Sequence, residues 1–440
     1  MRKVIGIKDA ETLLSSNRGL NLNSNSQTII SDSKRIFGKP LDTENYVREI
    51  IHYVIKHGDE AIKDLTLKIE GITLDRLNVN EEEIHQAYKN ISRTLKYALE
   101  KAAERIETFH SQCIKTQWMN KDKGYGQKYA AVESTGAYIP GGTAKYPSTV
   151  LMTTIPAKIA GVKDISITCP VSQNGLPPES VLAAAHIAGV RNVYCVGGAQ
   201  SIAAFAYGTE SISKVDIICG PGNIFVTLAK KIVYGDVGID GLYGPTETLI
   251  IADDSANPSF IASDLLAQAE HDKQAKPILI TTSMRIATEV EHELALKLER
   301  LSRKDIAQIS TQNEGIIAIV ETIQDAIKLS NTFGPEHLCL ATSYPEEHLS
   351  NVTNAGMIFL GDFSHEVLGD YGAGPSHVMP TAGTARFNSG LGIHTFQKII
   401  PIVGINKPDS LEIGQIAAII AKEEGLTAHA EAAEIRQEFI

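Results

Sequence analysis

Through the middle of the chain, short apolar runs alternate with longer amphipathic segments. The runs end in glycine or polar residues, as buried strands do, and the segments between them repeat their apolar positions at helical spacing. Strands that alternate with helices indicate βαβ units and a parallel sheet. The predicted strands are Ile165–Cys169, Asn192–Val196, Val215–Cys219, Thr248–Ala252, Ile278–Thr282, Ile316–Val320, His337–Ala341 and Met357–Leu360. The predicted helices between them are Val181–Ala188, Ala199–Tyr207, Ile224–Val233 and Ile286–Leu301.

This pattern predicts two α/β domains flanked by other segments. One domain is expected over residues 138–246, and a second over 247–391 together with the helical stretches of residues 31–137, at Glu44–Leu67 and Glu81–Thr108. Residues 1–30 are polar and rich in Asn and Ser toward their end, so they are expected to form an N-terminal arm or a small N-terminal element rather than part of a core. Residues 392–440 look helical.

One predicted helix carries an unusual polar end. Asn257 followed by Pro258 is typical of an N-cap and a first helical turn. The apolar stripe that runs through Leu265 is then broken by the amide of Gln268, and His271 follows one turn later. A carbonyl oxygen and an imidazole at this spacing can bind one metal ion. A helix end capped by a histidine is the alternative.

Two glycine turns follow predicted strands. They are Gly197–Gln200 and Gly220–Asn223, and the polar residues Gln200 and Asn223 end them. Ligands of open α/β sheets bind beyond the carboxyl ends of the strands, where helix N-termini attract phosphate groups. The spacing is not G-x-G-x-x-G, so the turns favour a nucleotide or phosphate ligand only weakly. The alternative is that such turns simply favour glycine.

Titratable residues stand in two further glycine-containing stretches. Glu336 and His337 follow a Gly-Pro turn, and a carboxyl–imidazole pair is suited to acid–base catalysis near neutral pH. Asp370 and His377 lie in a stretch where glycine allows the backbone to approach a ligand closely. A surface loop and a flexible turn are the respective alternatives.

A last pair of candidate residues, Glu424 and His429, lies near the C-terminus on either side of a glycine. The alternative to a functional role is a C-terminal segment that frays. One set of oxygen and nitrogen ligands that suits zinc can be drawn from these stretches. It consists of Gln268, His271, Asp370 and His429. These residues come from separate segments without strong ligand spacing. The sequence therefore permits a zinc site without requiring one.

The composition indicates a folded protein and argues against several functional classes. The 440-residue chain is 43% hydrophobic and 21% charged, as folded proteins are, and its net charge of −11 without a Lys/Arg cluster argues against a nucleic-acid surface. No apolar run approaches the roughly 20 residues that span a membrane, and no signal-peptide pattern opens the chain, so a cytoplasmic protein is expected. Five scattered cysteines without a C-x-x-C pair fit reduced thiols.

Six short runs of the sequence resemble the histidinol dehydrogenase family. They occur in the family's order and with matching distances, from about residue 30 to the C-terminus. The runs are Tyr138–Gly142, Gly220–Asn223, Gln268–Asp272, Gly334–Leu338, Gly369–Tyr371 and Glu424–His429. The resemblance implies oxidation of L-histidinol to L-histidine through bound L-histidinaldehyde with two NAD⁺, the last step of histidine biosynthesis.

The same resemblance implies a fold of two incomplete Rossmann-like, aldehyde-dehydrogenase-like α/β domains in an intertwined homodimer. Residues 138–246 would then associate with NAD, residues 31–137 and 247–391 would form the catalytic domain, and residues 392–440 would dimerise and complete the partner's active site. It implies one zinc ion per subunit on Gln268, His271, Asp370 and His429, and an acid–base pair of Glu336 and His337. It implies NAD contacts at Tyr138, Gln200 and Asn223, and substrate contacts at Thr246, His377 and Glu424 together with the zinc ligands and His337.

The chain departs from the family mainly near the expected substrate. The family usually has Asn where Ser376 stands, Ser at Thr246 and Ala at Gly334. Some relatives, including sulfopropanediol dehydrogenase, oxidise other polyols, so a related amino- or sulfo-alcohol is the alternative substrate. His377 and Glu424 suit an imidazole and an ammonium group and favour histidinol.

Overall fold

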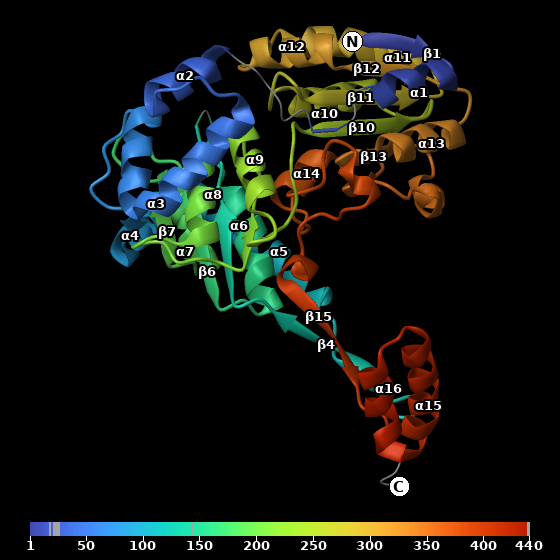
Figure 1. The fold of residues 1–440 in the computed structure, drawn as a ribbon. Coiled ribbons are helices and arrows are strands. Elements are labelled where there is room, and N and C mark those ends of the chain that lie inside the picture. Colours follow the sequence, from blue (N-terminus) through green and yellow to red (C-terminus); the bar gives the residue numbers. More distant parts are fainter. Residues whose placement is uncertain (17–18, 21–26, 143, 438–440) are drawn as a thin grey trace. The chain divides into compact units, whose positions relative to one another are not determined.

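The computed structural model describes residues 1–16, 19–20, 27–142 and 144–437 (Figure 1). Its chain forms two compact units. The first comprises Met1–Cys113 and Val132–Phe396, and the second comprises Ile114–Ala131 and Gln397–Ile440. No helix within the described ranges is both long enough and apolar enough to cross a bilayer.

The first unit contains two six-stranded sheets with the same core arrangement. One has the strand order β2-β7-β6-β5-β8-β9, and it is parallel except for β2, which pairs antiparallel with β7. From β5 to β9 the strands form a Rossmann-like order that lacks the sixth strand. The strands are β2 (Asn78–Val79), β5 (Ser134–Tyr138), β6 (Asp164–Cys169), β7 (Asn192–Cys195), β8 (Ile217–Cys219) and β9 (Gly238–Ile239).

Helices pack in two groups beside this sheet. The helices α4 to α7 contact one another in one group, and α3, α8 and α9 contact one another in the second. Ser92 caps the start of α5, so the helical stretch predicted from Glu81 is divided in two. The helices are α2 (Gln27–Phe37), α3 (Thr43–Glu70), α4 (Glu81–Asn90), α5 (Arg93–Gln112), α6 (Pro147–Ala160), α7 (Glu179–Ala188), α8 (Gly198–Tyr207) and α9 (Ile224–Val233).

The second sheet has the order β1-β12-β11-β10-β13-β14 and is parallel throughout. From β10 to β14 it repeats the incomplete Rossmann-like order, and β1 extends it. Its strands are β1 (Arg2–Ile5), β10 (Glu247–Ala252), β11 (Lys276–Thr281), β12 (Ile316–Ile319), β13 (His337–Ala341) and β14 (Met357–Leu360).

Apolar clusters cover both faces of this sheet, as expected for strands that read as continuous apolar runs. One cluster joins the sheet to α10, α11 and α12, and the other joins it to α1 and α13. These helices are α1 (Ile7–Ser16), α10 (Pro258–Ala269), α11 (Met284–Leu298), α12 (Lys304–Asn313) and α13 (Ile323–Phe333). Shorter helices follow at η1 (Pro345–Asn351), α14 (Glu366–Tyr371), η2 (Thr384–Arg386) and η3 (Ile393–Phe396).

The two parallel sheets confirm the predicted α/β class and the pair of incomplete Rossmann-like halves. The expectation that the N-terminal residues lie outside a core is wrong for residues 2–16. Strand β1 pairs in register with β12, and Ala10 and Leu14 are fully buried in the core beside it. These apolar positions pack because β1 adds an edge to the sheet that α1 then covers. Residues 17–18 and 21–26 of the expected arm lie outside the described residues.

The second unit combines a small antiparallel sheet with a helical pair. The sheet has the order β15-β4-β3, and its strands are β3 (Trp118–Asn120), β4 (Tyr125–Ala131) and β15 (Gln397–Val403). A helical segment over all of residues 392–440 is therefore wrong for 397–403, because those residues pair with β4. The helices α15 (Lys407–Glu423), α16 (Thr427–Glu434) and η4 (Ile435–Gln437) follow, and residues 438–440 lie outside the described ranges.

Candidate active site

The end of α10 brings the first pair of candidate ligands together. Asn257 caps the helix by accepting the Ser259 N–H, as its sequence predicts. Gln268, in the last turn, is only 1% exposed. The His271 N–H donates to the Gln268 carbonyl at 3.1 Å just past the helix end, and His271 itself is exposed. The amide is thus buried, and the imidazole stands at the edge of the same site.

Glu336 is held in a buried network at the beginning of β10 and β13. Its Oε2 lies 2.6 Å from the Thr246 hydroxyl and accepts the Glu247 backbone N–H at 3.0 Å. The same hydroxyl lies 2.7 Å from Gln268 Oε1. Burial raises the pKa of Glu336 to about 7. Its carboxyl can therefore change protonation state near neutral pH.

His337 opens β13 and is buried against Phe359, with the two rings stacked. Its Nδ1 lies 3.2 Å from the Glu247 carbonyl oxygen, and its Nε2 lies 3.4 Å from Asp370 Oδ1. Burial lowers the pKa of His337, but the carboxylates of Glu336 and Asp370 outweigh burial and raise it to about 10. The imidazole is thereby fixed between two carboxyl groups.

Asp370 and His377 form the next part of the same site. His337 and the neighbouring histidines hold the pKa of Asp370 below its ordinary value despite the opposing effect of burial. His377 Nδ1 lies 2.9 Å from the Asp370 backbone oxygen, and its Nε2 lies 3.1 Å from the Thr149 hydroxyl on α6. The first unit therefore brings together Thr246, Gln268, Glu336, His337, Asp370 and His377 through a chain of contacts.

The amide of Gln268 fits a metal ligand once its orientation is considered. The Thr246 hydroxyl has one proton and cannot donate to both Gln268 Oε1 and an ionised Glu336. Gln268 Nε2 is buried without a hydrogen-bond partner. The side-chain amide can be assigned in the opposite orientation, with its oxygen and nitrogen exchanged. Its nitrogen then donates to the Thr246 hydroxyl, and its oxygen takes the position that has no partner. A buried carbonyl oxygen without a donor is suited to a cation.

A second group of candidate residues surrounds the carboxyl ends of β5 and β8. Tyr138 is buried, and its hydroxyl accepts the Gly198 N–H at 3.3 Å. A Cβ on Gly222 would come within 3.1 Å of the Tyr138 ring. Asn223 caps α9 by accepting the N–H groups of Phe225 and Val226. Both glycine turns thus meet at Tyr138, at the point where the strand order reverses.

Gln200 lies in the first turn of α8 and is 2% exposed, next to the Gly198 turn. Glu424 and His429, by contrast, belong to the second unit, where Glu424 follows α15 and His429 lies on α16. Their participation in the site stays a prediction. Among the described residues, no three His, Cys, Asp or Glu side chains form a metal-binding group.

Glu247 is a site residue that sequence reasoning missed. Its backbone N–H and C=O contact Glu336 and His337, while its buried carboxylate pairs with Lys276 at 3.2 Å and accepts the Ala382 N–H. A signal was present, because a charged residue opens an otherwise apolar strand. A buried carboxylate without a partner is unfavourable, so a glutamate at a buried strand position predicts a cation next to it.

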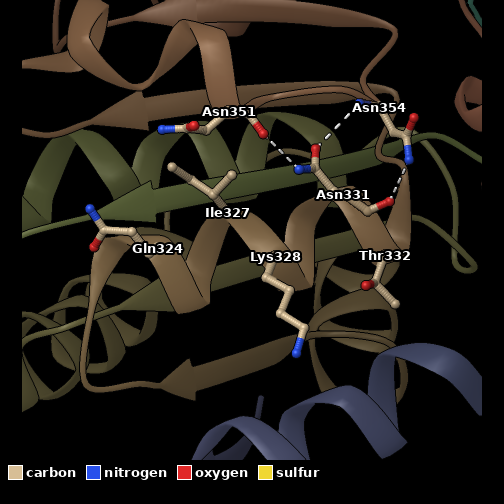
Figure 2. A pocket seen from close by; sticks show the side chains of 7 residues that line it. All are labelled: Gln324, Ile327, Lys328, Asn331, Thr332, Asn351 and Asn354. Atoms are coloured by element: carbon tan, nitrogen blue, oxygen red, sulfur yellow. Dashed lines mark hydrogen bonds between the residues drawn. The ribbon is translucent and has the colours of Figure 1, made fainter.

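A depression of about 510 Å³ lies away from these residues, between α13 and the segment before β14 (Figure 2). Amide side chains form most of its lining. Asn331 accepts the Thr353 N–H and donates to the Asn351 carbonyl, so its amide is used in holding the neighbouring loop. Lys328 is the one charged residue in the lining. The depression holds no acid–base pair and is not the candidate active site.

Two Rossmann-like sheets, with glycine turns at the end of one and a buried glutamate–histidine pair at the start of the other, fit an α/β oxidoreductase. The family model for histidinol dehydrogenase matches residues 36–437. The chain therefore belongs to the histidinol dehydrogenase family, a family of NAD-dependent oxidoreductases.

Individual relatives agree with this assignment. The histidinol dehydrogenase of Dehalococcoides mccartyi strain CBDB1 is 50% identical over 89% of this chain and 90% of its own length. That of Listeria monocytogenes serovar 1/2a is 47% identical over 90% and 94%. The crystal structure of histidinol dehydrogenase from Elizabethkingia anophelis has a TM-score of 0.91 at 34% identity, covering 100% of this chain and 98% of that one.

Proposed function

We propose that the protein oxidises L-histidinol to L-histidine through bound L-histidinaldehyde, with two NAD⁺, as the last step of histidine biosynthesis. The observation that carries the proposal is the buried pair of Glu336 and His337 beside Gln268 and Asp370. A small-molecule substrate and a cytoplasmic location fit such a biosynthetic enzyme. A related amino- or sulfo-alcohol is the second candidate substrate, since Thr246 and Ser376 depart from the usual family residues.

In the first oxidation, His337 takes the proton of the substrate hydroxyl, and a hydride leaves the carbon that bears this hydroxyl. The Glu247 carbonyl accepts from Nδ1 and keeps Nε2 facing the site. Proton transfer requires the neutral imidazole, which a metal ion on Asp370 would favour by opposing the charge of that carboxylate. NAD⁺, when bound, accepts the hydride.

In the second oxidation, Glu336 takes a proton from the water that attacks the aldehyde. The Thr246 hydroxyl and the Glu247 N–H orient its carboxylate. The aldehyde stays bound between the two steps, which prevents its loss to solvent. We assign NAD contacts to Tyr138, Gln200 and Asn223.

For the metal, we propose one zinc ion per subunit on Gln268, His271, Asp370 and His429, the last from the second subunit. Zinc would chiefly orient the amino alcohol and imidazole of the substrate. The orphaned position on the Gln268 amide supports this ligand set. We assign substrate contacts to Thr246, His377 and Glu424 in addition.

The second unit supports a homodimer with shared active sites. Its helical core consists of small residues, while large aliphatic side chains on α15 are exposed, with Ile416 at 53% and Ile419 at 69%. Exposed aliphatic side chains on one helix favour burial against another chain. A second copy that buries this helix would complete the site with His429 and Glu424.

The proposed four-electron reaction predicts two NADH for each L-histidinol consumed. The measurement is absorbance of NADH at exhaustion of a limiting histidinol sample, with L-histidine quantified in parallel. A yield of one NADH, or accumulation of free aldehyde, would exclude the second oxidation. In a panel of amino-alcohols and sulfo-diols, turnover of another diol without turnover of histidinol would favour the second candidate.

The raised pKa of Glu336 predicts the pH dependence of aldehyde oxidation. Only the ionised carboxylate accepts a proton, so the rate with supplied histidinaldehyde should fall as pH drops through about 7 and level off above it. Stopped-flow NADH formation across pH 5.5–9 measures this. Glu336→Gln should remove both the rate and this dependence. An unchanged profile in that variant would assign the ionisation to another group.

A further inference from the structure

A buried ion pair contacts the backbone of Gly220 on both sides, through its N–H and through its carbonyl. The Gly220 N–H donates to Asp240 Oδ2 at 2.7 Å, and its carbonyl accepts from Lys230 Nζ at 3.0 Å. Lys230 Nζ also lies 2.5 Å from Asp240 Oδ1. The side chains of Lys230 and Asp240 are 2% and 0% exposed. The pair therefore contacts the backbone of one glycine turn and is shielded from water.

Such a pair is not needed merely to fill the core. Desolvation of two charges offsets much of their attraction, and apolar residues of similar size often stabilise a fold as well or better. Lys230 also lies over the Tyr243 ring at 4.7 Å from its centroid, so its cation is enclosed on a third side. One of its three contacts is to the Gly220 carbonyl, in the peptide that Gly220 forms with Pro221.

The Gly220 turn needs such a constraint. Gly220 has φ of +102°, in the left-handed region, and a Cβ there would lie 2.3 Å from the Tyr138 carbonyl oxygen. The turn thus packs closely against Tyr138. Glycine adopts this left-handed conformation about as readily as conformations with negative φ, so the residue type alone does not select it. Without the ion pair, the buried N–H and carbonyl of Gly220 would lose the partners that they have in this conformation.

The constraint continues along the chain to the residues that we assign to NAD. Lys230 lies on α9, the helix that Asn223 caps, so the ion pair connects the start of the turn to the helix that follows it. The Thr227 hydroxyl donates to the Tyr243 carbonyl at 2.9 Å and fixes the segment after Asp240 to the same helix. Both ends of the turn are therefore fixed to α9.

We propose that Lys230 and Asp240 are positioning residues that set the affinity for NAD⁺ by holding the Gly220–Asn223 turn against Tyr138. The proposal rests on the proposed function, because it requires that NAD⁺ binds at this turn. Neither residue contacts the acid–base pair, and the effect is confined to the cofactor.

Lys230→Met tests the proposal, with Lys231→Met as the matched control. Lys231 is the next residue on α9 and is exposed. In K230M, the KM for NAD⁺ should rise roughly tenfold or more, because small displacements of a binding turn weaken its contacts. The KM for histidinol should stay within about twofold, and K231M should match the wild type in both values. Calorimetric titration with NAD⁺ alone should show the same loss of affinity.

A second variant covers the case in which K230M does not fold, since it leaves Asp240 buried without its cation. K230M/D240L removes both charges, should fold, and should show the same NAD⁺ defect. Wild-type NAD⁺ affinity in either folded variant, or equal rises in both KM values, would overturn the proposal.

The proposed function is tested separately by the wild type and by Asn223→Ala. Absence of histidinol oxidation by the wild type would remove the proposed function. An active enzyme in which N223A leaves NAD⁺ binding unchanged would remove the NAD assignment at this turn. A defect in N223A without one in K230M would overturn only the role of the ion pair.

Discussion

Replacing His337 by asparagine lowers kcat for histidinol by about 10²–10⁴-fold, the usual contribution of a positioned general base. His337 Nδ1 lies 3.2 Å from the Glu247 carbonyl oxygen, and an asparagine amide retains a donor for that oxygen. The substitution therefore removes the group that is proposed to move the substrate proton and keeps the anchoring contact. The KM for NAD⁺ and the zinc content should stay unchanged, because His337 is assigned to neither.

The control for this variant is His52→Asn, at an exposed position on α3, which should keep full activity. Gln268→Leu provides the contrast, since loss of a zinc ligand should lower both metal content and activity. Steady-state rates and elemental analysis measure the three variants together. A His337→Asn enzyme that retains more than about a tenth of wild-type kcat would remove His337 from the role of base.

The positions of the strands were predictable because each is a short apolar run. Strands β13 and β14 have the bounds that the pattern predicts, His337–Ala341 and Met357–Leu360. Their neighbours were not predictable from the pattern. A strand that is buried on both faces carries no alternation to distinguish one neighbour from another, so the reversal between β10 and β13 becomes evident only in the sheet.

The rule that ligands bind at the carboxyl ends of strands agrees with the proposed site in one sheet and disagrees with it in the other. In the first sheet, Tyr138 and Gly220 lie at those ends. In the second, the proposed acid–base pair of Glu336 and His337 lies at the amino ends of β10 and β13. At the opposite ends, Asp253 occupies the reversal point, where its carboxylate accepts hydrogen bonds from Ser255 and Ser343.

The sequence indicates the residue types of the candidate site, but it does not indicate the contacts that orient them. Glu336 and His337 are adjacent in sequence, and the residue that orients both is Glu247, which is distant in sequence and reaches them through its backbone. Backbone contacts leave no signature in side-chain identity. Strand β15 was missed for a related reason, since Ile399 and Ile400 are exposed on it and no buried face marks the segment.

Two inactive variants should restore each other's activity if active sites are shared between subunits. His337→Asn lacks a group of the first unit, and His429→Ala lacks a proposed ligand in the second unit. In a mixed dimer, one site carries both lesions and the other carries neither. Random exchange makes half of the dimers mixed, so activity should return to about a quarter of the wild-type value.

The matched control is a mixture of His337→Asn with Glu336→Gln. Both residues belong to the first unit and lie in one network, so every site of a mixed dimer keeps one lesion and no activity should return. Subunit exchange is verified with two affinity tags, and NADH formation is measured after sequential purification. If tagged mixed dimers of His337→Asn and His429→Ala remain inactive, His429 acts within its own chain. The zinc set would then have to be assembled from one subunit, with the second unit serving only the contact between chains.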